Sequence, residues 1–165
     1  TALLALDMLR TKGFNISSAA ARDGLFDTQW PGRIEIISEK PLVIVDGAHN
    51  VSGMGTLKDF VSGLANRKVL VLGIAKDKDI AAIVKLIVPL FEQVIVTQGN
   101  FKPADTEIIA KEVRKYCKSV REIKDVKGAV GAALGLVYKD EVLLFTGSLY
   151  MIGDVLGILK KKTDL

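Results

Sequence analysis

One short segment places several polar side chains directly after an apolar run that begins at Leu42. Five residues of polar or turn-forming type end that run: Asp46, Gly47, Ala48, His49 and Asn50. His49 is the only histidine among the 165 residues. A carboxylate at this point could accept hydrogen bonds from ribose hydroxyls, and an imidazole could donate to a phosphate oxygen. Asn50 is a candidate N-cap for a helix that begins near Val51, whose free N–H groups would favour an anion. The alternative is that His49 only makes hydrogen bonds within its own loop and contacts no ligand.

Two further polar clusters follow apolar runs in the same way. Asp77, Lys78 and Asp79 come after the run 68–74, and Asp79 is placed to cap the next helix. This cluster is either a solvated charge run or a loop in which Lys78 contacts a phosphate or carboxylate. Ser148 follows the run 141–147 as another candidate cap, which by itself predicts no ligand.

Several common catalytic motifs are absent from the sequence. It contains no G-x-x-x-x-G-K-[ST] loop to hold a triphosphate, and no G-x-G-x-x-G that opens a helix. With one histidine and one cysteine, a zinc site of His/Cys type is not expected. No G-x-S-x-G elbow supplies a nucleophile for His49. We therefore do not expect this chain to catalyse a reaction by itself.

The elements that must position these residues alternate between two patterns. Short β-branched runs typical of strands covered on both faces occupy 42–47, 68–74, 93–98 and 141–147, with a shorter one at 119–123. The segment 33–38 alternates polar and apolar residues, which predicts a strand at the sheet edge. Helical spacing of apolar residues separates the runs. The pattern predicts an α/β fold with a mostly parallel, doubly wound sheet of about six strands and one antiparallel edge strand.

In such sheets, ligands bind beyond the carboxyl ends of the strands. All three polar clusters follow strand ends, so we expect Asp46, His49, Asp77 and Ser148 along one edge of the sheet. His49 would then lie at the functional edge rather than in the core.

Composition narrows the functional classes. Hydrophobic residues make up 49% of the chain, enough for a packed core, and the net charge is only +4. The basic and acidic residues are mixed along the chain, so neither a nucleic acid nor a membrane is an expected partner. No apolar run approaches the ~20 residues that span a bilayer. The single cysteine, Cys117, falls in a helical apolar pattern, which favours a structural thiol and a cytoplasmic protein.

Four motifs together resemble one enzyme family. They are WPGR at Trp30–Arg33, DGAHN at Asp46–Asn50, DKDI at Asp77–Ile80 and GSLYMIGDVL at Gly147–Leu156. In this order and spacing the sequence is similar to the C-terminal domain of folylpolyglutamate synthase and dihydrofolate synthase, a branch of the Mur ligase superfamily. The resemblance implies that residues 30–165 form this Rossmann-like domain. Residues 1–29 would be the last helices of a preceding ATPase domain.

The resemblance implies an ATP-dependent amide ligase. In this family ATP phosphorylates a substrate carboxylate, and the amine of an incoming L-glutamate attacks the acyl phosphate. Arg33 would reach the ATP phosphates, Asp46 the ribose or the Arg33 side chain, and His49, taken as the catalytic candidate, would lie with Asn50 at the edge of the nucleotide cleft. Asp77, Lys78 and Ser148 would lie near the glutamate. ATP and Mg2+ would be held mainly by a P-loop domain, against which this domain packs, and folate or dihydropteroate would be the acceptor.

Two features depart from the family pattern, and two other functions compete. Val51 stands where the family commonly has proline, at a helix position that tolerates the change. Lys102 stands where relatives often carry arginine, so substrate contacts at that loop are left open. The competing functions are a Mur ligase domain for cell-wall precursors and a nucleotide-binding module without catalysis.

Overall fold

The computed structural model describes residues 2–64 and 67–163 and divides into two compact units, residues 1–31 and 32–165. The division falls after Pro31, two residues beyond the boundary expected from the sequence. Among the described residues, no helix combines the length and apolar character needed to cross a membrane.

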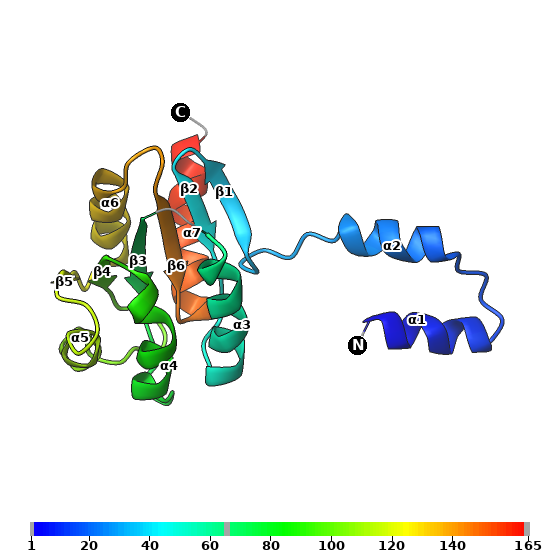
Figure 1. The fold of residues 1–165 in the computed structure, drawn as a ribbon, viewed down its shortest axis with the longest axis horizontal. Coiled ribbons are helices and arrows are strands. Elements are labelled where there is room, and N and C mark those ends of the chain that lie inside the picture. Colours follow the sequence, from blue (N-terminus) through cyan, green and yellow to red (C-terminus); the bar gives the residue numbers. More distant parts are fainter. Residues whose placement is uncertain (1, 65–66, 164–165) are drawn as a thin grey trace. The chain divides into compact units, whose positions relative to one another are not determined.

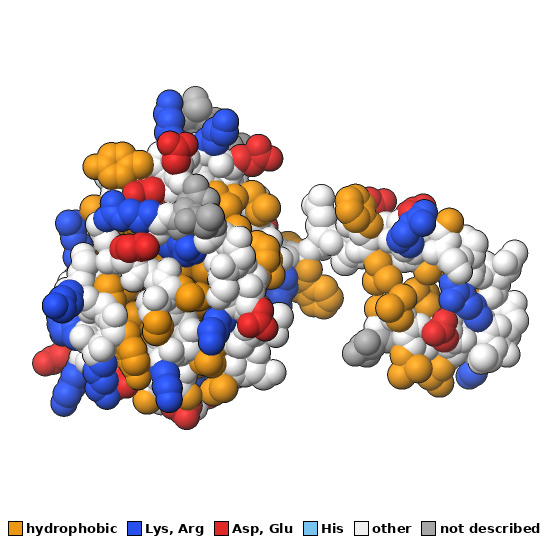
Figure 2. All heavy atoms as spheres, in the orientation of Figure 1, with side chains coloured by type: hydrophobic (Ala, Val, Ile, Leu, Met, Phe, Trp, Pro, Cys, Tyr) orange, Lys and Arg blue, Asp and Glu red, His pale blue; other side chains and the backbone are white. Residues whose placement is uncertain are grey.

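The first unit consists of two helices, α1 (Ala2–Thr11) and α2 (Ser18–Phe26). Ser17 caps α2 by accepting the Ala20 N–H, as the sequence predicts. Only Ala21 of the two helices is buried, whereas Leu4 and Phe26 are 66% and 89% exposed. Figure 2 shows hydrophobic side chains open to solvent on this unit. A helix pair of this kind has almost no core of its own.

The second unit is built on a six-stranded sheet in the order β1-β2-β6-β3-β4-β5. The strands are β1 (Glu35–Glu39), β2 (Leu42–Val45), β3 (Lys68–Leu72), β4 (Gln93–Val96), β5 (Val120–Glu122) and β6 (Val142–Thr146). β1 pairs antiparallel with β2, and every other neighbouring pair is parallel. The predicted fold class, including the antiparallel edge strand, is confirmed.

Helices cover both faces of this sheet (Figure 1). One face carries α3 (Val51–Ser62), α4 (Ile80–Ile87), the short 3-10 turn η1 (Val88–Leu90) and α5 (Thr106–Val113). The other carries α6 (Val126–Leu136) and α7 (Leu149–Thr163). Because both faces are covered, the central strands are apolar at consecutive positions rather than at alternate ones.

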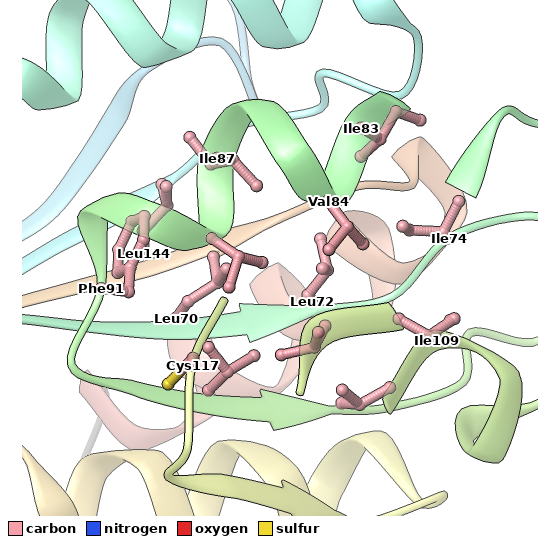
Figure 3. Close-up of a cluster of buried hydrophobic side chains, with 14 of the residues drawn as sticks. Leu70, Leu72, Ile74, Ile83, Val84, Ile87, Phe91, Ile109, Cys117 and Leu144 are labelled. Carbon is pink, nitrogen blue, oxygen red and sulfur yellow. The ribbon is translucent and has the colours of Figure 1, made fainter. Parts of the chain in front are cut away.

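Alternate strand residues supply two separate hydrophobic layers. Leu70 and Leu72 of β3 point to the α3–α5 face, where Figure 3 shows Ile83, Val84 and Ile87 of α4 lying over them. Val69 and Val71 belong to the layer beneath α6 and α7. Cys117 is buried in the first layer, which agrees with the structural role predicted for its thiol. The two layers fix the carboxyl ends of β2, β3 and β6 side by side.

Candidate functional site

The carboxyl edge of the sheet carries two cavities that share His49. The first has a volume of about 480 Å3 and contains the three predicted nucleotide contacts, Arg33, Asp46 and Asn50. The second has a volume of about 320 Å3 and contains the three predicted substrate contacts, Asp77, Lys78 and Ser148. The fold therefore brings all seven predicted residues together at one edge and separates them into the two expected groups.

Asp46 ends the strand run and is only 5% exposed. Its Oδ2 accepts the Ile34 N–H at 2.9 Å, and its Oδ1 accepts the Ala48 N–H at 2.8 Å. The carboxylate therefore ties together two backbone segments that lie twelve residues apart. Within the described residues no ion pair joins Asp46 to Arg33, which was one of the two roles expected for it.

Arg33 lies in the loop before β1 and is exposed at the first cavity. Its guanidinium donates to the Gly32 carbonyl at 3.2 Å. It also lies over Gly47, because a Cβ added there would come within 2.4 Å of Arg33 Nη1. The lack of a side chain at Gly47 thus leaves room for an arginine at this edge.

His49 is half-buried, and its Nδ1 lies 2.8 Å from the Gly47 carbonyl oxygen. A carbonyl can only accept, so Nδ1 carries a proton in this contact. In the neutral ring Nε2 then has a lone pair, and no other described residue is hydrogen-bonded to it. The histidine between the two cavities thus has one ring nitrogen, Nε2, that is not held by a hydrogen bond to the described residues.

Asn50 begins α3, as predicted, and its Oδ1 accepts the Gly53 N–H at 2.8 Å. The first turn of α3 lines the first cavity through Ser52 and Gly53. The positive end of the helix dipole therefore lies at the same cavity as Arg33. This combination provides an environment that favours a negatively charged group.

The second cavity combines an ion pair with a helix start. Lys78 Nζ lies 3.1 Å from Asp77 Oδ2, and Asp79 caps α4 by accepting the Ala82 N–H. Ser148 is 6% exposed, and its Oγ accepts the Met151 N–H of α7 at 3.5 Å, a long bond. In the described part of the chain, no three His, Cys, Asp or Glu side chains lie close enough together to hold a metal ion.

Replacing Lys78 with methionine is expected to raise the pKa of the Asp77 carboxyl. In the wild type that pKa is held below its ordinary value of 3.8, chiefly by the hydrogen bond from Lys78 and more weakly by the charge of Lys102. A lowered pKa means that the pair stabilises the fold above the unfolded pKa, and that this stabilisation is lost as the pH falls through the folded pKa. Carbon-detected NMR titration of Asp77 measures the shift. Lys76→Met, a neighbouring charge change, should leave the value almost unchanged.

Five residues that were not predicted as contacts also line the second cavity: Ala75, Phe101, Lys102, Leu149 and Tyr150. The Phe101 and Tyr150 rings are in contact, with centroids 4.2 Å apart and planes tilted by 32°, and Lys102 Nζ lies 5.3 Å from the Phe101 centroid. The loop holding Phe101 is fixed by the bonds Lys76 N–H to Lys102 O and Ala104 N–H to Ile74 O. In sequence, these rings look like ordinary apolar residues. Only their places just beyond strand ends, Phe101 in a loop and Tyr150 in the first turn of α7, could have indicated a surface role.

Two characterised ligases are similar in sequence to this chain. The dihydrofolate synthase/folylpolyglutamate synthase of Bacillus subtilis is 30% identical over 169 residues, covering 96% of this chain and 37% of its own length. A UDP-N-acetylmuramoyl-L-alanyl-D-glutamate–2,6-diaminopimelate ligase of Helicobacter pylori is 34% identical over 140 residues, covering 80% of this chain and 30% of its own length. The chain therefore spans only about a third of these relatives.

Solved structures of folate-branch enzymes also resemble this chain. E. coli FolC in complex with ADP superposes with a TM-score of 0.88 at 27% identity, over 99% of this chain and 40% of the other. The bifunctional folylpolyglutamate synthase/dihydrofolate synthase from Yersinia pestis, complexed with AMPPNP and a Mn ion, gives a TM-score of 0.81 at 25% identity. This match covers 94% of this chain and 38% of the other.

The family profile of the Mur ligase glutamate ligase domain matches residues 32–149, a range that includes every residue of both cavities except Tyr150. This range also starts where the second compact unit starts. With its fold, its two cavities and these matches in agreement, the chain belongs to the Mur ligase glutamate ligase domain family.

Proposed function

We propose that this chain is the C-terminal part of an ATP-dependent ligase that joins L-glutamate to dihydropteroate or folate. The observation that carries the proposal is the pair of cavities that meet at His49, one suited to a polyphosphate and one to an amino acid. The folate-branch names of the relatives support the choice of acceptor.

The first cavity would receive the phosphates of ATP. Arg33 supplies a permanent positive charge there, and the first turn of α3 supplies the positive end of a helix dipole. Phosphoryl transfer depends mainly on positioning and charge stabilisation, so these groups could complete a site whose triphosphate cradle lies elsewhere. The ADP and AMPPNP of the solved relatives agree with this assignment.

The second cavity would receive the incoming glutamate. Lys78 and Lys102 line it and can attract the carboxylates of an acidic amino acid. Ser148 and the start of α7 form another part of its wall. Its volume of about 320 Å3 is sufficient for a small amino acid but is at the low end for larger ligands.

His49 would accept a proton at the boundary between the cavities. When the amine attacks the acyl phosphate, a C–N bond forms, the C–O bond to the phosphate breaks, and the nitrogen must lose a proton. Nε2 of neutral His49 can take that proton, because Nδ1 is already donating to Gly47. Asp77 and Ser148 would help to shape the glutamate side of the cleft.

The remaining parts of such an enzyme would lie outside residues 32–165. We assign residues 1–31 to a preceding P-loop domain, since their two helices expose apolar side chains and bury almost none. That domain would bind the triphosphate and a divalent cation, Mg2+ by our proposal, while the solved relative holds Mn. Domain closure would then exclude water from the acyl phosphate.

A Mur ligase for cell-wall precursors is the second candidate, because the Helicobacter pylori relative is 34% identical. The folate branch is favoured by the combination of the Trp30–Arg33 and Gly147–Leu156 motifs. The two candidates share the ATP-dependent chemistry and differ in the acceptor, so substrate choice separates them.

The test is a ligation assay on the full-length protein that contains this chain. With ATP, Mg2+ and glutamate, we expect product with dihydropteroate, with a reduced folate, or with both, and none with a UDP-muramoyl peptide. The chain alone should give no product, because it lacks the triphosphate cradle. Turnover by the isolated chain would contradict the assignment of the triphosphate site to another domain. Ligation to the muramoyl peptide, with none to dihydropteroate or folate, would favour the second candidate.

A further inference from the structure

We propose that Asp46 is a positioning residue whose carboxylate holds Ile34 in a left-handed backbone conformation and thereby fixes Arg33 at the nucleotide cavity. The inference rests on the proposed function, in which Arg33 contacts the phosphates. It assigns Asp46 a role different from a direct contact with the nucleotide. Three features of the loop before β1 support it.

The first feature is the backbone of Ile34, which has φ +45°. β-Branched residues rarely adopt this region, because their Cβ substituents crowd the neighbouring peptide groups. The Ile34 side chain also packs against the hydrophobic layer under α3. Only external contacts can therefore keep this residue in so unfavourable a conformation.

The second feature is the bond that Asp46 makes to this residue. Asp46 is anchored in the sheet, because its N–H donates to the Phe145 carbonyl at 3.0 Å. Its Oδ2 accepts the Ile34 N–H, and its Oδ1 accepts the Ala48 N–H. Both acceptors are needed at once, and a buried carboxylate can supply them where an amide cannot. The side chain thus links the strained residue to the rigid end of β2.

The third feature is the position of Arg33 between two fixed residues. On one side, Gly32 accepts the Gly47 N–H at 2.7 Å, while its own N–H donates to the Glu35 carboxylate at 2.7 Å. On the other side is Ile34, held by Asp46. Without the Asp46 bond, Ile34 would relax toward negative φ and rotate the peptide that joins it to Arg33. The guanidinium would then leave the cavity.

Two double-mutant cycles in the full-length ligase test this role through kcat/KM for ATP. Asp46→Asn keeps the size of the side chain but offers only one acceptor, and we expect it to lower kcat/KM about 10- to 100-fold. Arg33→Ala should lower it by a similar factor. Because Asp46 acts through Arg33, adding Asp46→Asn to Arg33→Ala should cost less than about threefold more.

The second cycle replaces Ile34 with glycine, which adopts positive φ at no steric cost. In the Ile34→Gly background, Asp46→Asn should cost less than about threefold, since no strained residue is left to hold. If Asp46 instead contacts the nucleotide directly, the Asp46→Asn loss will be the same in all three backgrounds, and the proposal is wrong. KM for glutamate should stay within about twofold in every variant, and circular dichroism with thermal unfolding should identify any variant that fails to fold.

The outcome can be separated from a failure of the proposed function. If the wild-type protein shows no ATP-dependent ligation, the function is wrong, and Asp46 is then tested by structure alone. In that case NMR of the Ile34 backbone amide in Asp46→Asn should show a large chemical-shift change and a coupling constant typical of negative φ. An unchanged Ile34 signal would overturn the positioning role independently of any activity.

Discussion

Replacing Gly147 with alanine is expected to destabilise residues 32–165 by ~3–5 kcal/mol, the largest stability effect that we expect from a single glycine. Gly147 has φ +107°, a region that is essentially closed to residues with a side chain. An added Cβ would also lie 2.4 Å from the Gly73 carbonyl oxygen, which belongs to the backbone and cannot rotate away. Either the strand end or the start of α7 must move.

Urea unfolding followed by circular dichroism measures this loss as a lower midpoint at unchanged slope. The matched control is Gly157→Ala in α7, where an added Cβ meets no atom within 4 Å. There alanine should stabilise the helix by ~0.5–1 kcal/mol, because it reduces the entropy lost on folding. A Gly147→Ala protein as stable as the wild type would contradict the close approach of β6 and β3 at their carboxyl ends.

The sequence predicted the sheet well because most of its parallel strands are runs of consecutive apolar residues. Val69 and Val71 face one covered face and Leu70 and Leu72 the other, so the lack of polar alternation indicates that β3 is a central strand. The N-caps at Asn50 and Asp79 were predictable for a local reason, since the capping group and the capped N–H lie three residues apart. Because each of these caps follows a strand end, the sequence also predicted that the polar residues of both cavities lie at one edge of the sheet.

What the sequence could not provide is the set of contacts made between distant segments. The Asp46 carboxylate reaches Ile34 only after β1 has folded back beside β2, and no local pattern predicts a left-handed isoleucine. The same holds for the contact between Phe101, in the loop after β4, and Tyr150, in the first turn of α7 after β6. Such contacts depend on the twist and register of the finished sheet, which a single sequence does not specify.

On the function proposed above, replacing His49 with alanine is expected to lower kcat of the full-length protein by ~100-fold or more, which is the usual size of a proton-transfer contribution. The reason is the position of the ring, which lines both cavities and holds Nε2 ready to accept while Nδ1 donates to Gly47. Since His49 is only half-buried, stability should change by less than about 1 kcal/mol. Single-turnover quench experiments with glutamate and the acceptor measure the chemical step.

The matched variant is His49→Asn, because it separates proton transfer from a merely structural histidine. An asparagine Nδ2 can replace Nδ1 as the donor to the Gly47 carbonyl, but it has nothing at the position of Nε2. If the only role of His49 is its hydrogen bond to the Gly47 carbonyl, the asparagine variant should keep most of its activity while the alanine variant loses it. If Nε2 takes the proton of the incoming amine, both variants should be about equally slow, and both should still bind ATP. Near-normal turnover by His49→Asn would therefore remove His49 from the chemistry and leave it a loop contact.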